Sequence, residues 1–243
     1  AVVLLQCGVE PGLRHRFEFQ VQALAAEQLD AKAAIARAVD AMGGQAAFDA
    51  VDTYYSKATI TVGGQDLSSV VEVWWRNGDF YMRSEMPGLG VAQVWKHGEE
   101  TWGDDPVRGR HRLEGKQARA AMLDACPSLL AYWRRYFEHA QAGPAVAVEG
   151  RALVYVQFTG PDAADVTVGL DTDSGLPATH TSVRDTPQGA LPVTTWLHDY
   201  REVAEIRVPF RSTISMSLYE AVVDVQRFDI GVDIDPGTFD PKP

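Results

Sequence analysis

Tight turn signals between alternating apolar and polar runs constrain this chain more than any other feature of its sequence. Dipeptides suited to two-residue hairpin turns occur at Gly63-Gly64, Asn77-Gly78 and His97-Gly98. The flanking residues alternate with a period of two, which is typical of half-buried strands. The first half of the chain is therefore predicted to form antiparallel hairpins.

Pairing can be counted outward from these turns. The Asn77-Gly78 turn places Trp75 opposite Phe80 on one face and Glu72 opposite Arg83 on the other. Counting through Gly63-Gly64 pairs Val62 with Gln65, Ile60 with Leu67 and Ala58 with Ser69. Both turns predict the same inward face. This face consists of Ala58, Ile60, Val62, Leu67, Val71, Val73, Trp75, Phe80 and Met82. The opposite face still carries Val70, Trp74 and Tyr81, so we expect part of it to be covered too.

Two regions are helical in pattern. An amphipathic helix is predicted between Leu24 and Met42, ending at Gly43-Gly44. A helical insertion between Gly115 and Ala140 is broken at Cys126-Pro127 into two short helices, with Ser128 as N-cap of the second. Further strands are expected at Leu153–Phe158, Val166–Leu170, Ala178–Val183, Val193–Tyr200, Arg211–Tyr219 and Val225–Ile230.

These elements predict an α+β fold, a curled antiparallel sheet of roughly ten strands that forms a half-open barrel. The N-terminal helix and the helical insertion are expected to cover its concave face. Residues 31–243 form one domain in this interpretation, and residues 1–30 an N-terminal arm. Side chains either fill the interior of such a sheet or line a cavity for an apolar ligand, and the pattern alone leaves both open.

The arm itself is open to two interpretations. Its apolar start, Ala1–Leu5, resembles the end of a secretory segment, and Leu4–Cys7 resembles a lipidation site with Gln6 at a position where a small residue is usual. Arg14–Ala23 alternates like an extra strand of the main domain.

Charge and motifs exclude the common alternatives. A net charge of −11 opposes nucleic acid and anionic membrane surfaces as partners, and no segment is apolar enough to span a bilayer. Zinc-hydrolase, nucleophile-elbow and nucleotide-binding motifs are missing, so no catalytic residue, metal ligand or cofactor is predicted. Asp171–Gly175 is interpreted as a turn rather than a calcium loop, and Cys126 as a buried thiol. For an enzyme, His198 and Tyr200 would be the inward pair to inspect.

Several stretches, in this order along the chain, resemble the LolA/LolB superfamily of lipoprotein carriers and its relatives fused to zinc peptidases. They are the helix and turn Ala38–Gly44 with Phe48–Val51, the hairpin Lys96–Trp102, the turn Val168–Pro177, the hairpin Asp199–Val203 with Val208–Arg211, and Phe239 in a closing Asp-Pro-rich segment. One departure is Glu205, where the superfamily often has glycine.

The resemblance implies a non-enzymatic carrier of the bacterial periplasm or outer membrane that shelters a lipid or acyl chain, needs no cofactor and meets an envelope protein partner. The expected cavity lining is Ile60, Val62, Leu67, Val71, Val73, Trp75, Phe80, Met82, Leu130, Trp133 and Phe137. The alternative is a structural or interaction domain with a filled core in an envelope or protease-associated complex.

Overall fold

A single antiparallel sheet of thirteen strands organises the chain. The computed structural model describes residues 30–63, 67–88, 90–161, 165–186, 189–216 and 219–240. Strands β1 to β6 form a meander, β7 to β13 form a second one, and β13 pairs with β1 to join them. The order β6-β5-β4-β3-β2-β1-β13-β12-β11-β10-β9-β8-β7 leaves β6 and β7 as the two edges of an open sheet.

The first meander comprises β1 Thr53–Val62, β2 Leu67–Arg76, β3 Asp79–Met86, β4 Gly90–His97, β5 Glu100–Asp105 and β6 Gly109–Arg112. The second comprises β7 His139–Val148, β8 Arg151–Thr159, β9 Val166–Asp171, β10 Pro177–Thr186, β11 Gly189–Val203, β12 Ile206–Met216 and β13 Tyr219–Ile230. The helices are α1 Ala31–Ala41, α2 Gln45–Asp49, α3 Gly115–Ala125 and the short 3-10 helices η1 Trp133–Arg135 and η3 Pro236–Thr238.

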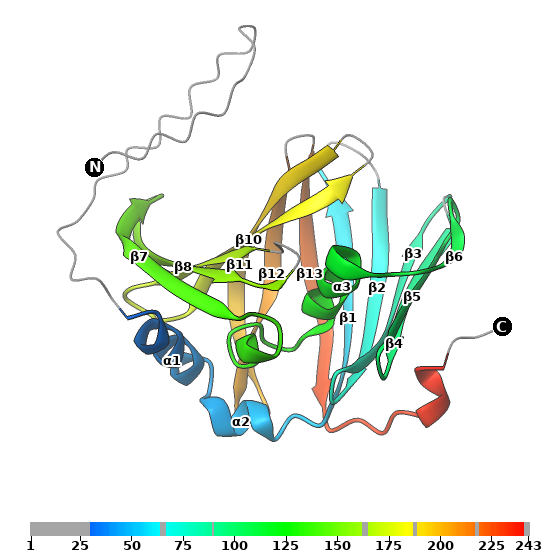
Figure 1. The fold of residues 1–243 in the computed structure, drawn as a ribbon, viewed down its shortest axis with the longest axis horizontal. Coiled ribbons are helices and arrows are strands. Elements are labelled where there is room, and N and C mark those ends of the chain that lie inside the picture. The colour runs from blue at the N-terminus through cyan, green and yellow to red at the C-terminus, as the bar shows by residue number, and fades with distance from the viewer. Residues whose placement is uncertain are drawn as a thin grey trace, which may run out of the picture.

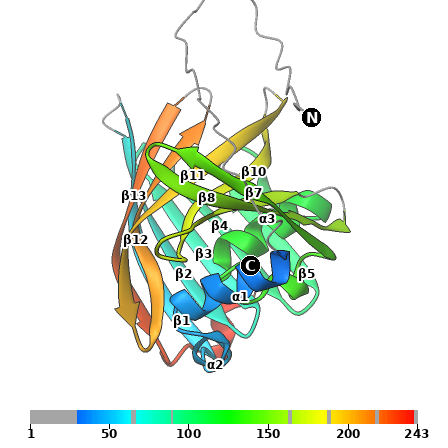
Figure 2. The same ribbon diagram turned by 90° about the vertical axis from the view of Figure 1, so that its left-hand side faces the viewer.

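The position of α3 follows from this topology. Because β6 and β7 lie at opposite edges of the sheet, the segment between them has to cross from one edge to the other. Figures 1 and 2 show the sheet curled around this crossing, with α3 inside the curl and α1 and α2 near one end. Helix α3 contacts β3, and its Asp124 pairs with Arg184 of β10, so it bridges the two halves of the sheet. Helix α1 contacts β7 and β8.

The register of the first hairpins matches the sequence prediction in part. Around Asn77-Gly78 the predicted pairs, including Trp75 with Phe80, are confirmed. Around Gly63 the prediction is wrong by two residues, since Val62 pairs with Leu67 and Ile60 with Ser69. The loop is therefore four residues long rather than two. A shift of two preserves the facing of every side chain, so the predicted inward face is unchanged. The third turn is Gly98-Glu99, one residue later than predicted.

Strand number and the helical insertion require corrections. The sheet has thirteen strands rather than roughly ten, and β6 and β7 were not predicted. The strand expected at Arg211–Tyr219 has the wrong bounds, since this range runs across the end of β12 into the start of β13. Only the first insertion helix is an α-helix. After Pro127 the chain makes turns and the 3-10 helix η1, with Ser128 Oγ accepting a hydrogen bond from the Ala131 amide at 3.2 Å. The aromatic residues of this segment pack in two places, since Tyr132 contacts Phe48 and Trp75 whereas Trp133 and Phe137 contact Phe158.

The hydrophobic core occupies one end of the curl. There Trp75 stacks on Tyr54 and also contacts the Tyr132 ring, while Phe137 and Trp133 pack on Phe158. Helix α1 contributes Ile35, Ala38 and Val39 to the same cluster.

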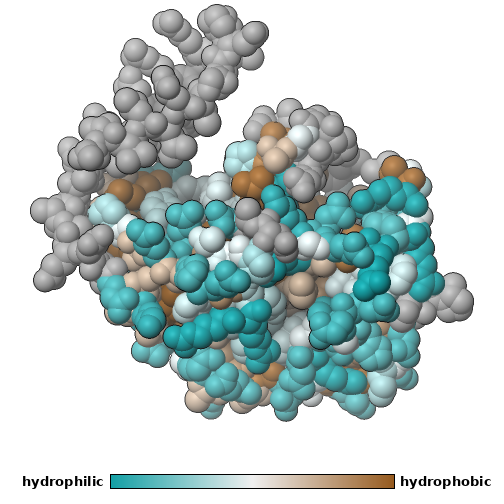
Figure 3. Space-filling model, viewed as in Figure 1, coloured by the Kyte–Doolittle hydropathy of each residue, from teal (hydrophilic) through white to brown (hydrophobic). Residues whose placement is uncertain are grey.

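A second, smaller cluster lies on the opposite face of β2–β4. It buries Tyr81 and Trp95 beneath Ile234 and Phe239 of the C-terminal segment, with Trp74 packed against them. The expected covering of that face is thus confirmed. On the view of Figure 1 the molecular surface is mostly hydrophilic, with hydrophobic side chains in separate small patches (Figure 3).

Some predictions fall on residues that the structure does not describe. Residues 1–29, including Cys7 and the strand expected at Arg14–Ala23, are among these, as is the start of the helix predicted from Leu24. The described part of that helix begins at Ala31, after the Asp30 side chain caps it by accepting a hydrogen bond from the Lys32 amide.

Candidate ligand-binding groove

The inward side chains become smaller along the strands, away from the core. At the core end, paired strands place Tyr54, Trp75 and Phe80 side by side. Two rows further along, the positions level with Val71 are occupied by Ser84 and Ala92. Large aromatic rings can fill the space between the sheet and its helical cover, whereas serine and alanine cannot. A hollow is therefore expected at the end of the inward face that lies away from the core, near Ser84 and Ala92.

The structure has a groove of about 460 Å³ at that end. Both halves of the sheet line it, since the first half supplies β1 to β4 and the second half β10 to β12. The apolar lining is Ile60, Val71, Val73, Met82, Ala92, Val94, Val193, Ile214 and Met216. The polar lining is Ser84, Asp124, His180, Ser182, Arg184 and Thr195. We call this space the inner groove.

Two further hollows adjoin the inner groove. One of about 760 Å³ lies between α3 and the ends of β3 to β5, and shares Met82, Val94 and Asp124 with the inner groove. The other, of about 140 Å³, lies between α3 and β10 and shares His180 and Ser182 with it. Arg184 lines all three, so it lies where they meet.

An ion pair connects the two walls at this junction. The Arg184 guanidinium of β10 donates through Nη2 to Oδ1 of Asp124 near the end of α3. Both side chains are partly exposed, at 31% for Arg184 and 40% for Asp124. Because solvent screens such a pair, its contribution to stability is small, about 1 kcal/mol or less. Its consequence is positional, since it holds α3 against the second half of the sheet.

His180 is the most unusual polar group of the site. Its Nε2 is buried and has no hydrogen-bond partner among the described residues. Burial lowers the pKa of the imidazole from 6.5 to about 4, an effect that the Arg184 charge reinforces and the Asp124 charge opposes. His180 is therefore neutral near pH 7, and one of its ring nitrogens can donate a hydrogen bond while the other accepts.

The residues predicted to line a cavity are divided by the structure. Ile60, Val71, Val73 and Met82 line the inner groove. Trp75 and Phe80, exposed by 2% and 1%, fill the core instead, and Phe137 packs there on Phe158. Val62 is half-buried near the end of β1, and Leu67 begins β2 with a side chain outside the described part.

Leu130 and Trp133 belong to a different place. With Ile35 and Val39 of α1 they line a separate hollow of about 460 Å³ between that helix and the turn before η1. They do not meet the residues of the inner groove, so the expected site is not one continuous surface. Sequence reasoning also missed the second wall, formed by β10 to β12. The sequence signal for this wall is the alternation of inward residues in these strands, such as Val193 and Thr195 on one face. Polar residues among the inward positions obscure this alternation.

The other chemical candidates are placed as follows. His198 is exposed on β11, whereas Tyr200 packs on the core and donates its hydroxyl to the Pro177 carbonyl at 3.0 Å, so the pair does not meet inside the sheet. The turn assigned to Asp171 is confirmed, because its carboxylate accepts hydrogen bonds from the Asp173 and Ser174 amides at 3.1 and 2.8 Å.

Among the described residues there is no group of three or more His, Cys, Asp or Glu side chains able to hold a metal ion. In the same part of the chain, no helix has the length and apolar character needed to cross a membrane. Cys126 is a free thiol whose pKa burial raises to about 11.

Comparison with known proteins identifies the fold. No protein-family model matches the sequence, and no curated protein is significantly similar to it. Among solved structures, a LolA superfamily protein from Nitrosomonas europaea aligns with a TM-score of 0.61 at 15% identity, covering 88% of this chain and 98% of its own.

Two other solved structures give similar values. A domain from Vibrio parahaemolyticus, described as an outer membrane lipoprotein-sorting protein, has a TM-score of 0.59 at 10% identity and covers 87% of this chain and 97% of its own. A DUF1329 family protein from Desulfovibrio piger has a TM-score of 0.58 at 13% identity, with coverages of 86% and 97%. The chain therefore has a LolA-like fold, as its sequence motifs predict.

Proposed function

We propose that this protein is a non-enzymatic carrier or binding protein that shelters an acyl chain or lipid in the inner groove. The observation that carries the proposal is the apolar lining of a 460 Å³ space between two walls of the sheet. Ligand pockets in proteins measure about 300–1,000 Å³ and combine an apolar lining with a few polar groups. The inner groove fits this description in both respects.

The energetics support an alkyl ligand. Burial of a methylene group contributes about 0.8 kcal/mol, so a chain of ten carbons gains roughly 8 kcal/mol before the entropic costs of binding are subtracted. Side chains such as Ile60, Val71 and Ile214 offer contact area without hydrogen-bond donors. A hydrocarbon chain can therefore bind there with no polar anchor.

Location and partners belong to the same proposal. A LolA-like fold, and the lipoprotein-sorting description of the Vibrio domain, support a place in the bacterial envelope and a role in lipid or lipoprotein trafficking. A carrier of this kind passes its ligand to another component, so an envelope protein partner is expected. Cys7 would anchor the chain if it were lipidated.

The test begins with the native protein. Native mass spectrometry of protein purified from its host should reveal a co-purifying lipid, and a fluorescent fatty acid should bind the delipidated protein. Ile60→Trp places a bulky ring in the inner groove and should weaken that binding at least about tenfold. Thr61→Trp is the matched control, because Thr61 is the next residue of β1, is exposed and faces away from the groove.

The alternative is a structural or interaction domain, and one observation favours it. Trp75, Phe80 and Phe137 are packed in the core with almost no exposed area, so part of the predicted cavity is filled. If the fatty acid fails to bind the delipidated wild-type protein, the carrier proposal is wrong and this alternative remains.

A further inference from the structure

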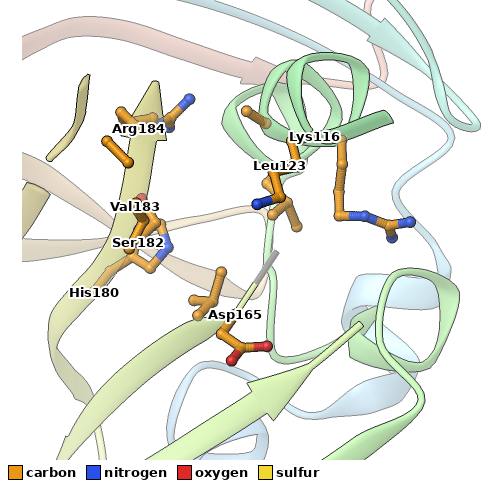
Figure 4. A pocket seen from close by; sticks show the side chains of 11 residues that line it. Lys116, Leu123, Asp165, His180, Ser182, Val183 and Arg184 are labelled. Carbon is orange, nitrogen blue, oxygen red and sulfur yellow. The ribbon is translucent and has the colours of Figure 1, made fainter. Parts of the chain in front are cut away.

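Cationic side chains gather in the small pocket beside the inner groove. This pocket, about 140 Å³ in volume, lies between α3 and β10 (Figure 4). Helix α3 supplies Lys116 and Arg119, and strand β10 supplies Arg184. Asp165 is the one acidic residue among the described lining residues, and Asp124, which pairs with Arg184, lies nearby. In a chain with a net charge of −11, the pocket is thus locally positive.

The pocket has hydrogen-bond donors that the described residues do not use. Of the Arg184 guanidinium, only Nη2 has a partner among the described residues, the Asp124 carboxylate, and the other N–H groups make no hydrogen bond with them. Lys116 is exposed and makes no hydrogen bond or ion pair with a described residue. His180 adds its buried Nε2, which has no partner in the same part of the chain.

The pocket and the inner groove adjoin each other along β10. His180, Ser182 and Arg184 line both spaces, because alternate residues of β10 face the interior along the boundary between them. Figure 4 shows these three residues along the strand, across the pocket from Lys116 and Leu123 of α3. A molecule with its polar end in the pocket would thus have the apolar groove beside it for its chain.

We propose that the pocket formed by Lys116, His180 and Arg184 binds the anionic headgroup of a single-chain amphiphile, a carboxylate or a phosphate monoester, whose alkyl chain occupies the inner groove. This inference rests on the proposed function and narrows its ligand class. Charged hydrogen bonds from guanidinium and ammonium groups to carboxylate or phosphate oxygens are about twice as strong as neutral ones. The volume of 140 Å³ admits one such headgroup but no bulky polar group.

The experiment compares three probes on the delipidated full chain by isothermal titration calorimetry. Dodecyl phosphate has both the chain and the charge, dodecanol has the chain alone, and inorganic phosphate has the charge alone. We expect dodecyl phosphate to bind about tenfold more tightly than dodecanol, and inorganic phosphate to bind far more weakly than either.

Two charge variants locate the headgroup. Lys116→Gln should weaken dodecyl phosphate binding about fivefold, and Lys116→Glu should weaken it further, with dodecanol affinity unchanged in both. Lys57→Gln is the matched control, since Lys57 carries the same charge on the face of β1 opposite Ile60. It should leave both affinities unchanged.

The outcomes separate the two proposals. Equal binding of dodecyl phosphate and dodecanol, or equal losses in the Lys116 and Lys57 variants, overturns the headgroup site and leaves the carrier function standing. Inorganic phosphate binding as tightly as dodecyl phosphate also overturns the inference, because the pocket would then be a site for free anions. Failure of all three probes to bind overturns the carrier function and the headgroup site together.

Discussion

Substitution of Gly43 by alanine should be among the most destabilising single changes outside the core. Gly43 follows helix α1 with a φ of +120°, which residues with a side chain rarely adopt. A Cβ atom at this position would lie 2.1 Å from the backbone oxygen of Glu205, in the turn between β11 and β12. The Arg207 amide donates to the Met42 carbonyl at 2.7 Å next to this contact, so neither segment can move away freely.

The magnitude follows from two costs. A positive φ costs a residue with a side chain about 1–2 kcal/mol relative to glycine. Inserting an extra carbon into a packed contact adds about 1–3 kcal/mol, and here the neighbour is backbone rather than a flexible side chain. Gly43→Ala should therefore lower the free energy of unfolding by about 3–4 kcal/mol, the middle of the summed range.

Urea denaturation followed by tryptophan fluorescence measures this change. Gly150→Ala is the control, because Gly150 has a φ of +79° and a Cβ atom added there would meet no described atom within 4 Å beyond its chain neighbours. It should lose only about 1 kcal/mol, the conformational cost alone. Equal losses in the two variants would show that the contact with Glu205 carries no energy and would refute the reasoning.

Three further predictions concern individual residues. Glu205 has a φ of +73°, so Glu205→Gly should raise the free energy of unfolding by about 0.5–1 kcal/mol in urea denaturation; a decrease would contradict this. Burial lowers the pKa of His180 to about 4, so its imidazole binds a proton more readily in the unfolded chain than in the folded one. The free energy of unfolding is therefore not lowered by His180 above pH 6.5, and it falls by up to about 3 kcal/mol as the pH decreases to 4. His180→Gln should reduce this loss when unfolding is measured across the same pH range. Because burial raises the pKa of Cys126 to about 11, its thiol should react slowly with Ellman's reagent at about pH 8 and much faster in urea.

The sequence predicted hairpins well where a strong turn motif defined them. Asn77-Gly78 gave every pair of β2 and β3 correctly, because both residues adopt positive φ, at 49° and 102°, as a two-residue turn of this kind requires. Gly63-Gly64 contains no such constraint, and its loop is longer than two residues. Strand β7 escaped prediction because Gly143 and Pro144 interrupt it, where the structure has a register shift between Ala142 and Ala145.

Only one wall of the inner groove, the one formed by the first half of the sheet, could be predicted from the sequence. Val71, Val73 and Met82 follow from the register of a local hairpin, so their common facing can be counted from the sequence. Asp124 and Arg184 are 60 residues apart and belong to different kinds of element. Their meeting depends on how α3 crosses the curled sheet, a tertiary property that no local pattern expresses.

A filled core and an open groove were alternatives in the sequence, yet the inner face has both, for a geometric reason. Helix α3 has 11 residues and is about 16 Å long, whereas the ten-residue strands β1 and β2 extend about 33 Å. A single crossing helix therefore cannot cover the inner face along its whole length. At the core end, Trp75 and Phe80 are large enough to fill the space. Beyond it the inward residues shrink to Ser84 and Ala92, and the sheet keeps a hollow that its own side chains do not occupy.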